Sequence, residues 1–270
     1  MICPACGFDN PEGTTSCARC GGSPSPAAPE SNPVQSRRYR RVFVGREEEL
    51  GRLHAAFDSA ASGQGSLIMV AGEPGIGKTA LCQQLASYVD TRDGKILTGH
   101  CYEEGSLSLP YLPFVEALRS HVLSREPEDL KRELGSGAEP LSRIVPEVRE
   151  KVQFQPRERA SPEEERFRLM QSVTDFLSSV AEKKLLLLIL EDLHDADKDT
   201  LSALTHLARN LSDARLLVVG TYRDVEVDRE HPLSAALAEL RRAPSFDRVL
   251  LWGLTRNQVR RIIETVTSQQ

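Results

Sequence analysis

The sequence contains no apolar run long enough to cross a membrane. Such a run needs about 18 residues, whereas the longest here, LLLLIL at 185–190, has the length of a buried strand. The apolar core of a signal peptide is also missing, because Cys3 and Cys6 stand where it would begin. We therefore expect a cytoplasmic protein, in a reducing compartment where cysteines bind metal more often than they pair.

Positive charge is not in excess either. The 270 residues include 34 Lys and Arg against 39 Asp and Glu, so a formal net charge of −5 gives no overall attraction for nucleic acid. The basic cluster RRYRR at 37–41 has a plain interpretation as a solvated flank of the core. The length suits one large α/β domain with a small appendage.

Four of the six cysteines lie in the first 20 residues, in the two similar motifs CPACG and CARCG. Four thiolates from two tight turns suit tetrahedral Zn²⁺, and so short a segment would need the metal in order to fold. The pattern resembles bacterial zinc ribbons, with disulfides as the alternative. We expect a zinc ribbon over 1–22 and a flexible, Pro- and Ser-rich linker over 23–38. The predicted zinc ligands are Cys3, Cys6, Cys17 and Cys20.

From residue 66 onward, short apolar strands alternate with stretches of helical periodicity. The strand-like runs are SLIMVAG, KILTGHCY, LLLLIL, RLLVVGTY and RVLLWGL. The best-marked helix begins at SPEEERF, where Ser161 can cap, Pro162 fits the first turn and Glu164 completes a capping box. Alternation of this kind predicts an α/β core over 39–253, with a doubly wound, mostly parallel five-stranded sheet and helices on both faces.

The segment GEPGIGKT at 72–79 is a complete G-x-x-x-x-G-K-[ST] motif, placed between a buried strand and a helix. Its glycines allow backbone N–H groups to point inward as an anion cradle, at the positive end of the following helix. Lys78 supplies a charge for the β- and γ-phosphates, and the Thr79 hydroxyl suits Mg²⁺. The predicted nucleotide-binding residues here are Gly72, Glu73, Pro74, Gly75, Ile76, Gly77, Lys78, Thr79 and Ala80.

Two acidic residues, Glu191 and Asp192, follow the most apolar strand, at the edge where open parallel sheets bind ligands. One carboxylate would hold Mg²⁺ and the other would polarise the attacking water, and a one-residue shift in register would exchange these roles. After the next strand, Arg223 could reach the γ-phosphate and report its presence. We assign catalytic roles to Lys78, Glu191, Asp192 and Arg223, and magnesium to Thr79 and Glu191.

These motifs, taken in order, resemble the STAND-type ATPases, a signalling branch of the AAA+-like P-loop ATPases found in LuxR-type large bacterial regulators and cyclase-associated ATPases. The matching segments, from about residue 42 to the end, are FVGREEEL, GEPGIGKT, GHCYEEGSLSLPYLPFVEAL, LLLLILEDLHDAD, LLVVGTYRD and LLWGLTRNQV. The resemblance implies that Val44, Gly45 and Arg46 lie near the adenine. It also implies that the acidic pair is the Walker B site, that Arg223 is a sensor, and that the P-loop strand lies beside the Walker B and sensor strands.

Members of that family are switches in which ATP or ADP sets the state of an attached effector, so the resemblance implies a protein partner. Many have aspartate where this sequence has Glu191, a difference that favours slow hydrolysis. After residue 253, Thr255 and Gln258 form a capping box that opens a helix with an unpartnered apolar stripe. We interpret 254–270 as the first helix of an incomplete lid, and the chain as a fragment or natural truncation.

The sequence thus predicts a regulatory ATPase module that uses ATP, Mg²⁺ and Zn²⁺ and hydrolyses ATP slowly. Oligomerisation is compatible with this prediction, and nucleic acid is not an expected partner. One alternative is a nucleotide-binding scaffold without turnover. A DNA-associated ATPase, suggested by the ribbon and RRYRR, is the less favoured alternative because the net charge is negative.

Overall fold

The computed structural model describes residues 43–103, 109–155 and 160–267. The chain divides into two units between Phe43 and Val44, and all the helices and strands described below belong to the second unit. The predicted zinc ligands Cys3, Cys6, Cys17 and Cys20, like the predicted linker, lie outside the described residues. Within the described ranges, no helix is long and apolar enough to cross a membrane.

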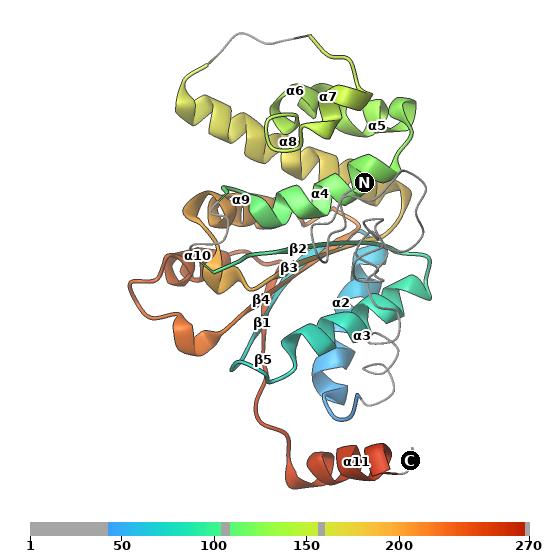
Figure 1. Cartoon of the computed structure of the whole chain (residues 1–270), viewed down its shortest axis with the longest axis vertical. Helices are drawn as coiled ribbons and strands as arrows, with labels where there is room; N and C mark the ends of the chain where they lie inside the picture. Colours follow the sequence, from blue (N-terminus) through green and yellow to red (C-terminus); the bar gives the residue numbers. More distant parts are fainter. Residues whose placement is uncertain (1–42, 104–108, 156–159, 268–270) are drawn as a thin grey trace, which may run out of the picture. The chain divides into compact units, whose positions relative to one another are not determined.

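A five-stranded parallel sheet with the order β2-β3-β4-β1-β5 organises the described residues (Figure 1). The strands are β1 (Ser66–Ala71), β2 (Lys95–His100), β3 (Leu186–Glu191), β4 (Leu216–Tyr222) and β5 (Phe246–Leu250). This confirms the predicted α/β sheet and corrects one expectation. The P-loop strand β1 lies beside the sensor strand β4 but not beside the acidic strand β3, because β4 runs between them.

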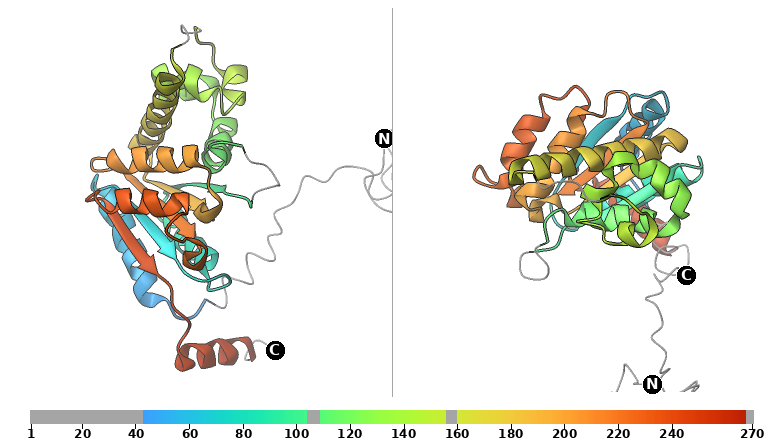
Figure 2. Two further views of the ribbon diagram at one scale, coloured as in Figure 1. Left: turned by 90° about the vertical axis from the view of Figure 1, so that its left-hand side faces the viewer. Right: turned by 90° about the horizontal axis from the view of Figure 1, so that it is seen from above.

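Helices cover both faces of the sheet (Figure 1). They are α2 (Glu47–Ala61), α3 (Lys78–Asp90), α4 (Leu112–Ser124), α5 (Pro127–Leu134), α6 (Ala138–Leu141), α7 (Glu147–Lys151), α8 (Pro162–Lys183), α9 (Lys198–Arg209), α10 (Pro232–Leu240) and α11 (Arg256–Thr267), with short 3₁₀ turns η1 (Gly135–Gly137), η2 (Leu193–Asp195) and η3 (Asp224–Glu226). Helices α2 and α3 pack on one face, and α4, α8, α9 and α10 on the other. The short helices α5 to α7 pack against α8 and α4 (Figure 2).

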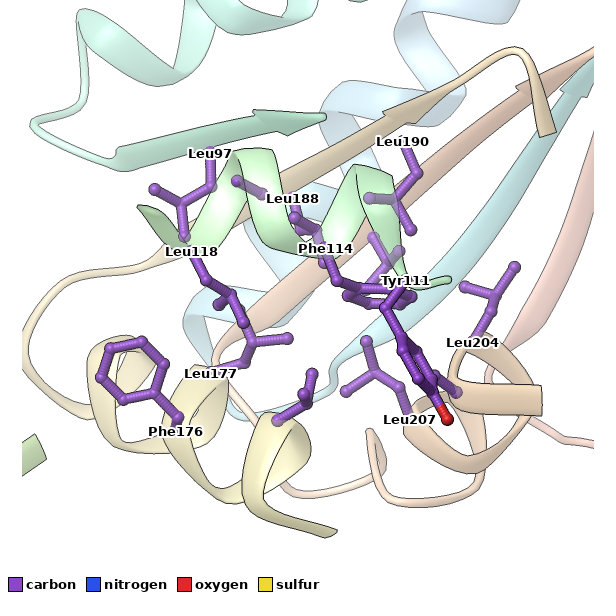
Figure 3. Close-up of a cluster of buried hydrophobic side chains, with 14 of the residues drawn as sticks. Leu97, Tyr111, Phe114, Leu118, Phe176, Leu177, Leu188, Leu190, Leu204 and Leu207 are labelled. Atoms are coloured by element: carbon purple, nitrogen blue, oxygen red, sulfur yellow. The ribbon is translucent and has the colours of Figure 1, made fainter. Parts of the chain in front are cut away.

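The larger core lies between the sheet and the α4, α8 and α9 layer (Figure 3). Because successive strand residues point to opposite faces, Leu188 and Leu190 of β3 face this layer, where they lie with Phe114 and Leu118 of α4 (Figure 3). Both faces of β3 are covered, so every residue of the strand is buried, which explains its continuous apolar sequence. Helix α4 lies so close to β2 that a Cβ on Gly99 would be 1.8 Å from the Pro113 carbonyl oxygen.

The local helix signals are confirmed at both predicted capping boxes. At α8, the Glu164 N–H donates to the Ser161 hydroxyl, and the Glu164 carboxylate accepts from the Ser161 N–H. At α11, the Thr255 N–H donates to the Gln258 side chain over 2.8 Å. Strand β5 is shorter than predicted: it ends at Leu250, and Trp252 beyond it is 71% exposed.

Candidate nucleotide-binding site

The loop between β1 and α3 has the backbone that an anion cradle requires. Gly75 (φ 73°) and Gly77 (φ 104°) adopt conformations that side chains disfavour. Gly77 directly precedes the first residue of α3, so the N–H groups of the loop and of the helix start gather at one place. A Cβ on Gly72 would lie 3.0 Å from the Leu251 carbonyl oxygen, which fixes the loop against the segment after β5. This backbone fits a bound phosphate chain.

The Lys78 side chain folds back over this loop. Its Nζ donates to the Gly72 carbonyl over 2.9 Å and to the Glu73 carbonyl over 3.1 Å, and the residue is only 7% exposed. Burial lowers the pKa of Lys78, and the nearby Asp192 carboxylate opposes that shift. The ammonium group is therefore held inside the loop, where phosphate oxygens would be stronger partners than the two carbonyls.

Thr79 and Glu191 meet at the mouth of the loop. The Thr79 hydroxyl donates to Oε2 of Glu191 over 2.5 Å, although 112 positions separate the two residues. Glu191 is buried and ends β3, and its carbonyl accepts from the Cys101 N–H over 2.9 Å. A hydroxyl and a carboxylate side by side are oxygen ligands of the kind that Mg²⁺ takes, with phosphate and water completing the shell.

Asp192 is oriented differently from its neighbour. It adopts a left-handed conformation (φ 58°, ψ 44°), and its N–H donates to the Thr221 hydroxyl of β4 over 3.0 Å. The backbone therefore leaves the strand direction immediately after Glu191. The structure thus brings Glu191, and not Asp192, into contact with Thr79. The assignment of magnesium to Glu191 and of water orientation to Asp192 stays a prediction that this geometry favours.

The predicted sensor, Arg223, follows β4 at the same edge of the sheet. Its guanidinium donates to the Glu226 carboxylate over 2.8 Å, and its side chain is 39% exposed. The charge of Arg223 is close enough to contribute to the lowered pKa of Lys78. Arg223 therefore lies within the electrostatic reach of the P-loop but is paired with its own turn.

Arg46 of the lead-in segment contacts both the P-loop and the segment after β5, and it follows the half-buried Val44 and the buried Gly45. The buried Arg46 guanidinium donates to the Ile76 carbonyl over 3.3 Å and to the Trp252 carbonyl over 2.5 Å. Gly45 has φ 79°, and a Cβ there would lie 2.9 Å from the Gln258 side chain. Three distant segments thus meet beside the loop, and the role of Val44, Gly45 and Arg46 at the adenine stays a prediction.

One buried residue at this edge received no functional role from the sequence. His194, in η2, is 5% exposed, and neither ring nitrogen has a hydrogen-bond partner among the described residues. Its Nε2 lies 3.4 Å from Glu226 and 3.5 Å from Asp195, and its Nδ1 lies 4.0 Å from Asp192. Burial lowers the pKa of His194, which favours the neutral ring. A buried polar group without a hydrogen bond costs about 1–3 kcal/mol, so this one requires an explanation.

The other titratable residues considered from the sequence have ordinary structural roles. His100 contacts Glu116, with Nδ1 3.1 Å from the carboxylate, and His206 lies 3.2 Å from the Gln171 side chain. Cys101 is buried, and burial raises the pKa of its thiol to about 12, so it is protonated and unreactive. Among the residues described here, no group of three or more His, Cys, Asp or Glu could hold a metal ion.

A model of the AAA ATPase domain family matches residues 42–219, well over half of the chain. Among solved structures, a Signal Transduction ATPase with Numerous Domains (STAND) protein with a tetratricopeptide repeat sensor from Pyrococcus horikoshii is similar at 15% identity and a TM-score of 0.44. That match covers 85% of this chain and 26% of the other. A RuvB variant from Thermotoga maritima is similar at 16% identity and a TM-score of 0.38, covering 84% of this chain and 52% of RuvB.

A chain in the structure of Drosophila ORC bound to DNA is similar at 11% identity and a TM-score of 0.39, covering 84% of this chain and 98% of that one. This chain therefore spans about half of RuvB and about a quarter of the STAND protein. A search among curated proteins found no significant sequence match.

Proposed function

The chain belongs to the AAA ATPase domain family, and we propose that it is a regulatory ATPase module that binds Mg–ATP and hydrolyses it slowly. The observation that supports this most directly is the 2.5 Å hydrogen bond between Thr79 and Glu191 beside the P-loop. It places a hydroxyl and a carboxylate at the loop that would hold the phosphates. Magnesium bound there would neutralise charge on the β- and γ-phosphate oxygens.

Different residues of the chain would bind the phosphates, the metal and the adenine of Mg–ATP. The N–H groups of 72–79 surround the phosphates, and the Lys78 ammonium exchanges its two loop carbonyls for phosphate oxygens. Thr79 and Glu191 would hold the metal. Arg46 ties the lead-in segment to Ile76 and Trp252, and this closes the proposed adenine side of the site.

We expect slow ATP turnover because of Asp192, the second residue of the acidic pair. In the proposed arrangement Glu191 serves the metal, so Asp192 orients the attacking water, with a side chain one methylene shorter than glutamate. Its backbone is fixed by Thr221, while its side chain is 38% exposed. An exposed carboxylate is surrounded by bulk water and orients one particular water molecule poorly. The same observation favours the alternative of a nucleotide-binding scaffold without turnover.

Phosphate release under Mg–ATP separates these two functions. We expect slow release by the wild-type protein, and none above background by Lys78→Ala or Asp192→Asn. Equal release by the wild type and Lys78→Ala would contradict the enzymatic proposal. Nucleotide retained through purification without any release would identify the scaffold.

The regulatory role and the zinc ribbon are further parts of the proposal. We expect the ATP and ADP states to differ in their affinity for a protein partner or for an effector outside this sequence. The four cysteines of 1–22 would hold one Zn²⁺ and serve protein docking. Metal analysis of the full chain tests this point: one zinc per chain is expected, with loss in Cys3→Ser and retention in Cys82→Ser. Zinc retained by Cys3→Ser would contradict it.

A further inference from the structure

The Glu226 carboxylate lies between two side chains that can each donate to it. Oε1 accepts the 2.8 Å hydrogen bond from Arg223, while Oε2 is 3.4 Å from Nε2 of His194. The second contact is close, but it is not a hydrogen bond, because both ring nitrogens of His194 are unpartnered in the described structure. The Glu226 carboxylate therefore has a hydrogen-bond donor in Arg223, whereas the His194 ring has no hydrogen-bond partner among the described residues.

The three side chains differ in their freedom to move. The side chains of Arg223 and Glu226 are 39% and 41% exposed, whereas that of His194 is 1% exposed and is held by packing. A rearrangement in this cluster would therefore move the arginine and the carboxylate and leave the imidazole in place. A small rotation of the Glu226 side chain would turn the 3.4 Å contact into an aligned hydrogen bond.

We propose that His194 is a positioning residue that takes over the Glu226 carboxylate when Arg223 turns to the γ-phosphate. The proposal rests on the proposed nucleotide function. Without His194, Arg223 could reach a γ-phosphate only by leaving Glu226 without a hydrogen-bond partner from the protein. With His194 in place, Glu226 exchanges one donor for another, so the ATP state is stabilised relative to the ADP state.

The same exchange would affect Asp192. The Nε2 side of the His194 ring faces Glu226 at 3.4 Å and Asp195 at 3.5 Å, and its Nδ1 side faces Asp192 at 4.0 Å. A hydrogen bond donated from Nε2 to Glu226 would fix the tautomer of the neutral ring, so that Nδ1, on the side of Asp192, would be an acceptor. His194 would thus connect the side chain that detects the γ-phosphate with the one that acts on water.

The test is calorimetric titration of the full chain with ATPγS and with ADP, both with Mg²⁺, so that the readout is binding and not turnover. We expect His194→Ala to weaken ATPγS binding about tenfold, the change produced by losing roughly one charge-assisted hydrogen bond. ADP binding should change less than twofold. His194→Gln, which retains a donor, should recover most of the loss. The matched control is His206→Ala, which removes a half-buried histidine of α9 and should change neither affinity.

The Glu226→Gln background gives a second, independent measurement, and because Glu226 is exposed this variant should fold normally. In Glu226→Gln, Arg223 has no carboxylate partner to give up when it turns to the γ-phosphate. Adding His194→Ala to this variant should therefore change ATPγS affinity less than twofold. An equal loss for ATPγS and ADP, or the same loss in both backgrounds, would overturn the proposal and show a purely structural histidine. A wild-type protein that bound neither nucleotide would overturn this inference and the proposed function together.

Discussion

The Thr79 hydroxyl on α3 donates a 2.5 Å hydrogen bond to Oε2 of Glu191 at the end of β3. Strands β1 and β3 are not neighbours, since β4 lies between them. The bond therefore depends on the parallel order of the whole sheet, which brings the carboxyl ends of β1, β4 and β3 to one edge. Each prediction about the site depends on this convergence.

Glu191 should determine how strongly Mg²⁺ improves ATP binding. Glu191→Gln can still accept from Thr79, but it has lost the charge that attracts the metal. We expect the gain in ATP affinity on replacing EDTA with Mg²⁺ to fall by about tenfold or more. Titration with fluorescent ATP, with and without metal, measures this gain. Asp192→Asn is the matched control and should keep the gain; a reduction in Asp192→Asn and not in Glu191→Gln would exchange the assigned roles.

Asp192 should affect turnover and leave affinity unchanged. A positioned acid or base contributes roughly 10²–10⁴-fold to a rate, so Asp192→Asn should reduce phosphate release by about a hundredfold and change ATP affinity less than twofold. Asp175→Asn, on the surface of α8, should leave both unchanged. Unimpaired release by Asp192→Asn would remove this residue from the mechanism.

Gly45 and Gly51 should respond to alanine with opposite signs. Gly45 has φ 79° and faces the Gln258 side chain, so Gly45→Ala should lower the free energy of unfolding by about 1–2 kcal/mol. Gly51 lies within α2, and a Cβ there would meet nothing within 4 Å. Gly51→Ala should therefore raise stability by about 0.5–1 kcal/mol. Thermal unfolding measures both, and stabilisation by Gly45→Ala would contradict the described turn.

A buried ion network should make stability depend on pH. The Glu133 carboxylate of α5, 4% exposed, accepts from Nε2 of His121 over 2.8 Å, from Arg125 over 2.6 Å and from Lys183 over 3.0 Å. Burial would raise the pKa of Glu133, but these three hydrogen bonds outweigh it and hold the pKa below its ordinary value of 4.5. The folded state therefore favours the charged form. The stabilisation that charged Glu133 gives to the fold is fully present above pH 4.5. It is lost as the pH falls through the lowered pKa of Glu133 in the folded state.

Glu133→Gln measures that contribution. We expect the variant to be less stable than the wild type by about 3 kcal/mol near neutral pH, because the cationic partners lose their charge partner. The difference should shrink as the pH falls below 4.5. Denaturant titrations across this range give the comparison, with the exposed Glu128→Gln on the same helix as control. A difference independent of pH would show that the charge of Glu133 does not stabilise the fold.

Features encoded within a few residues were predictable from the sequence. The P-loop needs only its own glycines and the strand and helix beside it, and the caps at Ser161 and Thr255 need only the residue three positions later. The apolar strand before Glu191 was recognisable because burial on both faces leaves no polar alternation.

Features that depend on tertiary packing were not predictable. The place of β4 between β1 and β3 is a long-range pairing that no local pattern encodes. The small helices α5 to α7 pack against α8 and α4, and their bounds did not follow from the sequence. His194 stands in an acidic turn that looks solvated, and only packing places its ring at 1% exposure among three carboxylates. Its position three residues after Glu191 was the only available signal.

Calorimetric binding of Mg–ATP to the wild-type chain and to Lys78→Ala tests whether the P-loop holds the nucleotide. Lys78 is the only lysine that donates to the P-loop carbonyls in the described structure, whereas Lys131 is exposed on α5, which packs against α8. We predict one ATP per wild-type chain, a loss of about a hundredfold in affinity for Lys78→Ala, and no change for Lys131→Ala. Equal affinity of the wild type and Lys78→Ala would show that this loop does not hold the phosphates of ATP.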